Sequence, residues 1–181
     1  EEQTIETIQK NLYNTFDSNI ENEYFNNNNI SLINNNMPTL FNKIRNKNIK
    51  ICLNTGFNKK IQKTIIDKLN MYSFIDDFIS SEEVSLGRPH PYMIQSLMNR
   101  HNISDSKQII KIGDTKNDIL EGINSECLAS IGVLSGSESL ENLEMTEATD
   151  IIESIMKLDV YDYENMPNYR GVMDYNDIII L

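Results

Sequence analysis

Apolar residues recur at two different spacings along the chain, and each spacing predicts a different element. Intervals of three and four residues place side chains on one face of a helix, and residues 2–16 show this spacing. The apolar positions of this helix are Ile5, Ile8, Leu12 and Phe16. An asparagine-rich stretch that ends at Asn36 is typical of a loop. A second helix is expected over residues 37–47, with Pro38 in its first turn, where a missing N–H costs nothing.

From residue 49 onward, short apolar runs alternate with turns and amphipathic helices. Such runs are typical of strands buried on both faces, and their alternation with helices predicts a parallel sheet covered by helices. The strands are expected over residues 49–53, 74–80, 108–112, 127–133 and 149–152. Helices are expected over residues 58–69 and 91–100, and from the turn at 113–115 to residue 124. The predicted fold class is α/β, with a doubly wound parallel sheet.

The last stretch of the chain, residues 159–181, departs from this alternation and ends on the apolar run DIIIL. It is consistent with an extra strand, with a linker, or with the start of a further segment. The apolar ending is the main sequence hint that more protein follows.

Length and charge narrow the functional classes. A chain of 181 residues is long enough for one domain with its own core. The formal net charge of -11 argues against nucleic acid as a partner, because binding it needs a clustered surplus of Lys and Arg. The apolar runs fall short of the roughly 18 to 20 residues that cross a bilayer, and no charged-then-apolar leader opens the chain. We therefore expect a cytoplasmic protein that binds neither nucleic acid nor membranes.

Four residues with reactive side chains receive no role in function. Cys52 and Cys127 each lie inside an apolar run, which is typical of buried, reduced thiols. His90 and His101 are typical of surface or helix-end positions.

The turns that follow the predicted strands carry the candidate chemistry. In an open parallel sheet, the loops that leave the carboxyl ends of the strands share one rim, and ligands bind there. The polar and glycine residues of these loops are Thr55 with Gly56, Arg88, Asp114 with Asp118, and Ser135 with Gly136. A hydroxyl, a cation, paired carboxylates and glycines together are the components of a phosphate and metal site.

Each of these residues suits one task. The hydroxyl of Thr55 and the backbone N–H of Gly56 can both donate to one phosphoryl oxygen, helped by the positive end of the following helix. Arg88 can spread charge over the phosphoryl oxygens in the transition state. Two carboxylates, Asp114 and Asp118, suit Mg²⁺, a hard ion that takes oxygen ligands and keeps several waters. The metal would also neutralise an anionic substrate in an acidic protein.

Simpler interpretations exist for each residue taken alone. Asp118 lies where a capping box with Thr115 would place it, at the start of a helix. Thr55 and Asn58 are compatible with an ordinary turn and N-cap. Arg88, between Gly and Pro, is compatible with a surface turn. The functional interpretation is favoured because three individually weak signals are predicted to fall on one rim.

Three stretches taken together resemble a known family. They are ICLNTGFNKKIQKTIIDKL, SSEEVSLGRPHPYMIQSLMNRHNI and IIKIGDTKNDILEGINSECLASIGVLSGS. Their order resembles the phosphonatase-like branch of the haloacid dehalogenase superfamily. The resemblance implies a Rossmann-like α/β core over residues 37–158 that lacks its first strand. It also implies that residues 1–36 are the last part of a helical cap with an asparagine-rich linker.

The same resemblance implies a role for each residue of the site. Thr55 would hold the phosphoryl group, helped by the N–H of Gly56. Arg88 stands where many relatives carry Lys and would stabilise the nucleophile and the phosphate charge. Asp114 would bind Mg²⁺ directly, and Asp118 would orient metal-bound water.

One component of the family's site is missing from the sequence. Family members attack phosphorus with an Asp in a D-x-D-G-T or D-x-A-G-T motif on the first strand, which precedes the cap and would lie N-terminal to residue 1. Neither motif occurs in these 181 residues. The preferred interpretation is a Mg²⁺-dependent phosphohydrolase that acts on a small phosphorylated metabolite through an aspartyl-phosphate, in an incomplete chain that is inactive as given.

Three other interpretations stay open to different degrees. The chain could be a non-catalytic remnant that keeps the fold as a binding or scaffolding module. It could also derive from a hydrolase of the phosphonoacetaldehyde type, which cleaves a C–P bond. A receiver-like domain is disfavoured by the GRPHPYM loop and the cap-like helices. Substrate choice would depend on the cap, most of which is absent, and the oligomeric state is not visible in the sequence.

Overall fold

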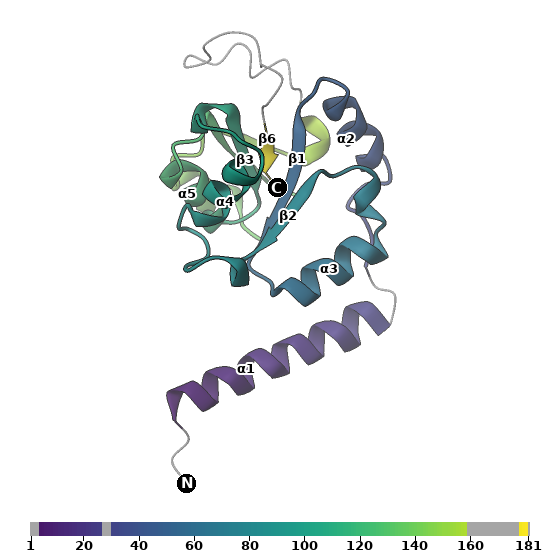
Figure 1. Ribbon diagram of the computed structural model, residues 1–181, viewed down its shortest axis with the longest axis vertical. Coiled ribbons are helices and arrows are strands. Elements are labelled where there is room, and N and C mark those ends of the chain that lie inside the picture. The colour runs from purple at the N-terminus through teal and green to yellow at the C-terminus, as the bar shows by residue number, and fades with distance from the viewer. Residues whose placement is uncertain (1–3, 27–29, 159–177, 181) are drawn as a thin grey trace.

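One parallel sheet organises the molecule (Figure 1). The computed structural model describes residues 4–26, 30–158 and 178–180. In this part of the chain the sheet has six strands in the order β2-β1-β6-β3-β4-β5, and neighbouring strands are parallel. The strands are β1 (Lys50–Thr55), β2 (Asp77–Ser80), β3 (Ile109–Gly113), β4 (Ala129–Val133), β5 (Asp150–Ile152) and β6 (Ile178–Ile180).

Helices connect the strands and cover both faces of the sheet. They are α1 (Ile5–Ile20), α2 (Met37–Arg45), α3 (Lys59–Lys68), α4 (Tyr92–Arg100), α5 (Lys116–Asn124) and α6 (Leu140–Glu144). The expected α/β fold class is confirmed, and each predicted core helix is present with ends that shift by one or two residues. No helix in the described residues is both long and apolar enough to cross a membrane.

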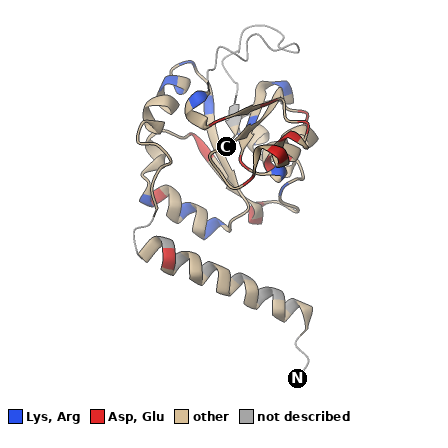
Figure 2. Ribbon diagram, turned by 180° about the vertical axis from the view of Figure 1, so that it is seen from behind, with Lys and Arg blue, Asp and Glu red and all other residues tan. Residues whose placement is uncertain are grey.

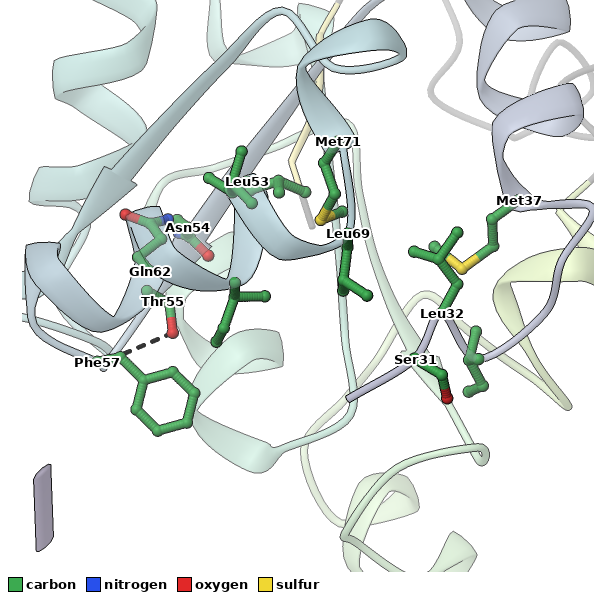
Figure 3. Close-up of a pocket in the computed structure, with 13 residues that line it drawn as sticks. Ser31, Leu32, Met37, Leu53, Asn54, Thr55, Phe57, Gln62, Leu69 and Met71 are labelled. Atoms are coloured by element: carbon green, nitrogen blue, oxygen red, sulfur yellow. Dashed lines mark hydrogen bonds between the residues drawn. The ribbon is translucent and has the colours of Figure 1, made fainter. Parts of the chain in front are cut away.

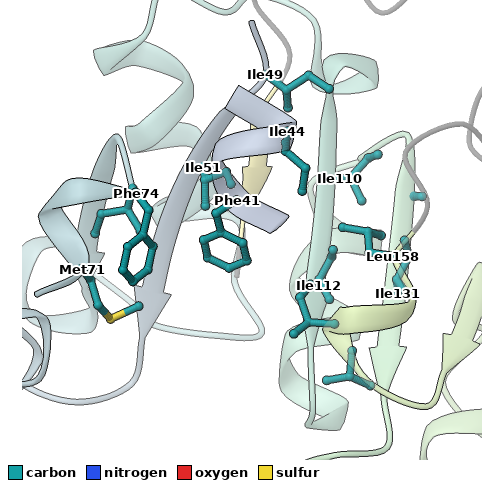
Figure 4. Packing of buried hydrophobic residues seen from close by; sticks show 14 of the residues in the cluster. Phe41, Ile44, Ile49, Ile51, Met71, Phe74, Ile110, Ile112, Ile131 and Leu158 are labelled. Atoms are coloured by element: carbon teal, nitrogen blue, oxygen red, sulfur yellow. The ribbon is translucent and has the colours of Figure 1, made fainter. Parts of the chain in front are cut away.

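The alternation of side chains along the strands produces two separate cores. Neighbouring residues Ile51 and Cys52 belong to different apolar clusters on opposite faces. One cluster contains Phe41 and Ile44 of α2, which pack on the sheet (Figure 4). The other contains the apolar face of α4 and Ile180 of β6. A doubly wound sheet with two buried faces explains why its strands are continuous apolar runs.

Helix α1 lies outside this body, next to α3 (Figure 1). Its predicted apolar stripe is exposed, with Ile5 77% and Leu12 66% accessible. The ring of Phe16 stacks on that of Phe57, with 6.1 Å between ring centroids. The predicted helix is therefore present, although its apolar face has little to pack against in the described residues.

The predicted loop up to Asn36 is partly wrong. Helix α1 continues to Ile20, and a π-helix follows over Glu21–Asn26. The reason is tertiary packing, because Phe25 is buried with 7% of its surface exposed. Composition alone favoured a loop, but burial of one aromatic side chain favours continued helix.

The end of the chain forms an extra strand, one of the three options that the sequence left open. Strand β6 is not at an edge; it pairs with both β1 and β3, and Ile180 is fully buried. The sheet therefore includes residues that lie outside the expected core range of 37–158. Residues 159–177 and 181 lie outside the described part of the chain.

Both cysteines are free and buried, as predicted. Burial raises the pKa of the Cys127 thiol to about 12 and raises the pKa of Cys52 still further.

Charged side chains are spread over many elements, and several of the lysines lie on α3 (Figure 2).

Candidate functional site

Contacts between loops at the carboxyl ends of β1 and β3 define the candidate site. Arg88, in the loop between β2 and α4, forms an ion pair with Asp118 at the start of α5. A Cβ added to Gly56 would lie 3.4 Å from Nη2 of Arg88, so the loop after β1 also reaches this ion pair. A Cβ added to Gly113 would lie 2.2 Å from Cβ of Asp118, which places the end of β3 against the same carboxylate. The three predicted loops therefore meet.

The loop after β1 is short and leads directly into a helix. Oγ1 of Thr55 accepts a hydrogen bond of 3.2 Å from the backbone N–H of Phe57. Asn58 caps α3, because its side chain accepts from the N–H of Ile61 at 2.8 Å. The carbonyl oxygen of Gly56 accepts a bond of 3.0 Å from the hydroxyl of Ser81. The loop is thus held at the positive end of α3, a geometry that favours anions.

Asp118 is the most constrained acid of the site. Its Oδ2 accepts from the N–H and the hydroxyl of Thr115, at 3.2 and 2.6 Å, and a capping box is present. Its Oδ1 contacts Arg88 and also Nζ of Lys111, the latter at 2.9 Å. Burial by itself would raise the pKa of Asp118, but the charges of Lys111 and Arg88 and the bond from Thr115 outweigh it and lower the pKa to about 2. The carboxylate is therefore ionised at neutral pH.

The capping interpretation and the functional interpretation of Asp118 are therefore compatible. One oxygen caps the helix, while the other faces Arg88 and Lys111. Arg88 is not a surface turn residue, because only 20% of its side chain is exposed and it faces the buried acid.

Asp114 occupies a more open position on the same rim. Its Oδ2 accepts hydrogen bonds from the backbone N–H and the hydroxyl of Ser137, at 2.8 and 2.9 Å. A Cβ added to Gly136 would lie 2.1 Å from Cβ of Asp114, so the loop after β4 passes directly against this side chain. The predicted Ser135-Gly136 loop thus lies at the site.

The donor set suits Mg²⁺ only as part of a larger coordination shell. Within the described residues, no group of three or more His, Cys, Asp and Glu side chains could hold a metal ion. Mg²⁺ is commonly held by one or two carboxylates, substrate phosphate oxygens and waters. Asp114 is half-buried and accessible to an ion. Asp118 has both oxygens engaged by protein groups, which suits an indirect role.

Sequence reasoning missed a buried polar group beneath this rim. Lys111 of β3 has 0% of its side chain exposed, and its Nζ donates to Oδ1 of Asn54 at 2.9 Å and to Asp118 at 2.9 Å. Nδ2 of Asn54 donates to Oε2 of Glu121 at 2.7 Å. Burial raises the pKa of Glu121. The available signal was a single Lys inside the apolar run IIKIG, since Lys is rarely buried without a partner.

Two apolar cavities flank the site. One, of about 310 Å³, lies beside Thr55 and is lined by Leu53 and Phe57 among others (Figure 3). The other, of about 330 Å³, lies beside Asp114. Ile33 and Met37 line both cavities, so the chain around the start of α2 borders the cavity beside Thr55 and the cavity beside Asp114.

Comparison with known proteins bears on the family of the chain. A family model described as haloacid dehalogenase-like hydrolase matches residues 1–131. Phosphonoacetaldehyde hydrolase from Parabacteroides distasonis is 34% identical over 98 residues, which cover 54% of this chain and 37% of the relative. Phosphonoacetaldehyde hydrolase from Bacillus cereus is 25% identical over 145 residues, which cover 73% of this chain and 54% of the relative. The chain thus spans about half or less of the length of these relatives.

Solved structures support the fold. The structure of a HAD hydrolase, family IA, variant 3, from Entamoeba histolytica superposes with a TM-score of 0.74 at 18% identity, covering 90% of this chain and 72% of that one. A phosphonoacetaldehyde hydrolase like protein from Oleispira antarctica superposes with a TM-score of 0.66 at 19% identity, covering 74% and 57%. At these identities, the two structures support the fold alone. The family match over residues 1–131 shows that the chain belongs to the haloacid dehalogenase-like hydrolases.

Proposed function

We propose that the rim formed by Thr55, Gly56, Arg88, Asp114 and Asp118 is the phosphoryl and Mg²⁺ site of a phosphohydrolase that acts on a small phosphorylated metabolite. The observation that carries this proposal is the contact between Arg88 and Asp118, because it joins the GRP loop to the GDTKND loop beside the Thr55 loop. The family is typically Mg²⁺-dependent, and the metal would supply charge neutralisation for the phosphoryl group.

Each residue then has a task that follows from its surroundings. Thr55 and the N–H of Gly56 would donate to a phosphoryl oxygen at the N-terminus of α3. Arg88 is buried enough for its charge to act in a low dielectric, and would stabilise charge on the phosphoryl oxygens. Asp114 would bind the ion, and Asp118, held by Thr115 and Lys111, would orient a metal-bound water.

The position of β6 suggests where a nucleophile could stand relative to the rim. Ile180 pairs with Cys52 of β1 on one side and with Lys111 of β3 on the other. Thr55 lies three positions after Cys52, and Asp114 lies three positions after Lys111. Because paired parallel strands advance in step, the third position after Ile180 would be level with Thr55 and Asp114. An aspartate there could attack phosphorus while the ester P–O bond breaks and the leaving oxygen takes a proton. Water would then release inorganic phosphate and restore the carboxylate.

A pair of extended chains tests the catalytic part of the proposal. Both carry the same short segment after Leu181, with Asp at its second position in one and Asn in the other. We expect Mg²⁺-dependent hydrolysis of p-nitrophenyl phosphate from the Asp chain alone, and none from the unextended protein. Hydrolysis by the 181-residue protein itself, or equal rates in both extended chains, would contradict the proposal.

Metal binding tests the site without catalysis. Titration of Mn²⁺, with and without inorganic phosphate, should show weaker binding in the Asp114→Asn protein than in the original chain. The matched control is Asp67→Asn, the same chemical change on the exposed face of α3. Equal affinities in all three proteins would leave the scaffolding alternative as the better explanation.

A C–P bond hydrolase is the second candidate, and the names of the relatives favour it. Competition between a phosphonate and a phosphate monoester for the Mn²⁺-loaded chain separates the two candidates. Preferential binding of phosphonoacetaldehyde over a phosphate ester of similar size would support the phosphonate alternative.

A further inference from the structure

Among the residues whose side chains the structure describes, Lys111 is the only buried lysine, and the proposed reaction gives it no task. It projects from β3 into a space closed by α5, where a Cβ added to Gly122 would lie 2.8 Å from Cβ of Lys111. The side chain is 0% exposed, so neither solvent nor a substrate reaches it. A role in function must therefore act through its neighbours.

These neighbours belong to both halves of the rim. Nζ of Lys111 donates at 2.9 Å to Asn54, which directly precedes Thr55 in β1. It also donates at 2.9 Å to Asp118 of α5. It lies 3.7 Å from Glu121, which in turn accepts from Asn54. One ammonium group thus connects the strand that carries the phosphate loop with the helix that carries the second acid.

A contribution to stability alone is a weak explanation for a buried lysine at this position. The buried cation Lys111 and the partly buried cation Arg88 face two buried acids, Asp118 and Glu121. Buried ion pairs are costly to desolvate, and apolar residues of similar volume often replace them without loss of stability. Oε1 of Glu121 also lacks a hydrogen-bond partner in the described structure, which is a further cost.

We propose that Lys111 is a positioning residue, which couples the phosphate-binding half of the rim to the metal-binding half by holding Asn54 and Asp118 in fixed register. The inference rests on the proposed function and adds to it the residue that aligns its two parts. Some side chains do not bind a metal themselves but hydrogen-bond to the residues that do. Removal of such side chains commonly weakens metal binding by about 10- to 100-fold.

The experiment uses the double substitution Lys111→Met with Glu121→Gln. It removes one positive and one negative charge together, so the buried cluster stays neutral and the fold is expected to persist. The control is Lys107→Met, the same change at an exposed lysine four residues earlier. For each protein we would measure urea unfolding, Mn²⁺ affinity, and the ratio of inorganic phosphate affinities with and without Mn²⁺.

We expect the double variant to unfold at nearly the original urea concentration but to bind Mn²⁺ about 10-fold more weakly, with a reduced effect of Mn²⁺ on phosphate binding. A folded double variant with original Mn²⁺ affinity and original coupling overturns the inference, because Lys111 would then serve folding alone. If the unsubstituted chain binds no Mn²⁺, the proposed function itself fails, and the two failures are thereby distinguished.

Discussion

The two loops of the candidate site differ in how far the folded chain already satisfies their polar groups. On the β3 side, Asp118 is engaged by Thr115, Lys111 and Arg88 and is nearly inaccessible to solvent. On the β1 side, the hydroxyl of Thr55 accepts a single 3.2 Å turn bond among those described. A satisfied carboxylate acts as a scaffold, whereas a loosely held hydroxyl can exchange its turn bond for a ligand. Substitution of Asp118 should therefore mainly lower stability, whereas substitution of Thr55 should mainly weaken binding.

The largest effect is expected from Asp118→Asn. The change removes the buried negative charge that pairs with both Lys111 and Arg88. Removal of one partner of a buried ion pair costs about 3 kcal/mol or more, because the other charge is left unpaired. The free energy of unfolding, measured by urea denaturation, should fall by that amount. Asp114→Asn is the matched comparison and should change the free energy of unfolding far less, because the Asp114 carboxylate hydrogen-bonds only to Ser137 in the described residues. Similar losses of unfolding free energy in the two variants would contradict the interpretation of Asp118 as a structural residue and of Asp114 as an accessible ligand.

A pair of glycine substitutions compares the two sides by steric means. In Gly136→Ala, the new Cβ would lie 2.1 Å from Cβ of Asp114, so the loop or the acid must move. We expect a loss of about 1 to 3 kcal/mol in unfolding free energy and weaker Mn²⁺ binding. In Gly56→Ala, the nearest atom to the new Cβ is Nη2 of Arg88 at 3.4 Å, an ordinary contact. Gly56→Ala should leave stability nearly unchanged, and an equal loss in both variants would mean that the β1 loop is as tightly packed as the β3 side.

The pH dependence of stability should also follow the β3 side. Folding lowers the pKa of Asp118 from 3.8 to about 2, so its contribution is fully present above pH 4 and is lost as pH falls toward 2. A shift of this size corresponds to about 2 kcal/mol. Urea denaturation at pH 5 and at pH 2.5 should show a smaller loss of stability in Asp118→Asn than in the original chain. A parallel loss in both proteins would assign the acid sensitivity to other carboxylates.

The sequence predicted the rim of the site better than the polar network beneath it. Apolar runs and turn residues sufficed to locate Thr55, Arg88 and Asp114, because parallel strands bring the loops at their carboxyl ends together regardless of side-chain detail. The network around Lys111 could not be predicted, since its pairing with Asn54 depends on the register between β1 and β3. That register is set by β6, which the sequence placed only as one of three options.

A small expected effect on stability, with a clear effect on binding, comes from Thr55→Val. The substitution keeps the shape of the side chain but removes the oxygen that accepts from the N–H of Phe57, a hydrogen bond worth about 1 kcal/mol or less. Because the N-terminus of α3 and the N–H of Gly56 remain, binding of inorganic phosphate in the presence of Mn²⁺ should weaken several-fold without being abolished. Thr64→Val, the same change within α3, removes a hydroxyl bonded to the carbonyl of Lys60 and serves as the control. Loss of phosphate affinity in Thr64→Val to the same extent, or unchanged affinity in Thr55→Val, would mean that the β1 loop does not bind the phosphoryl group.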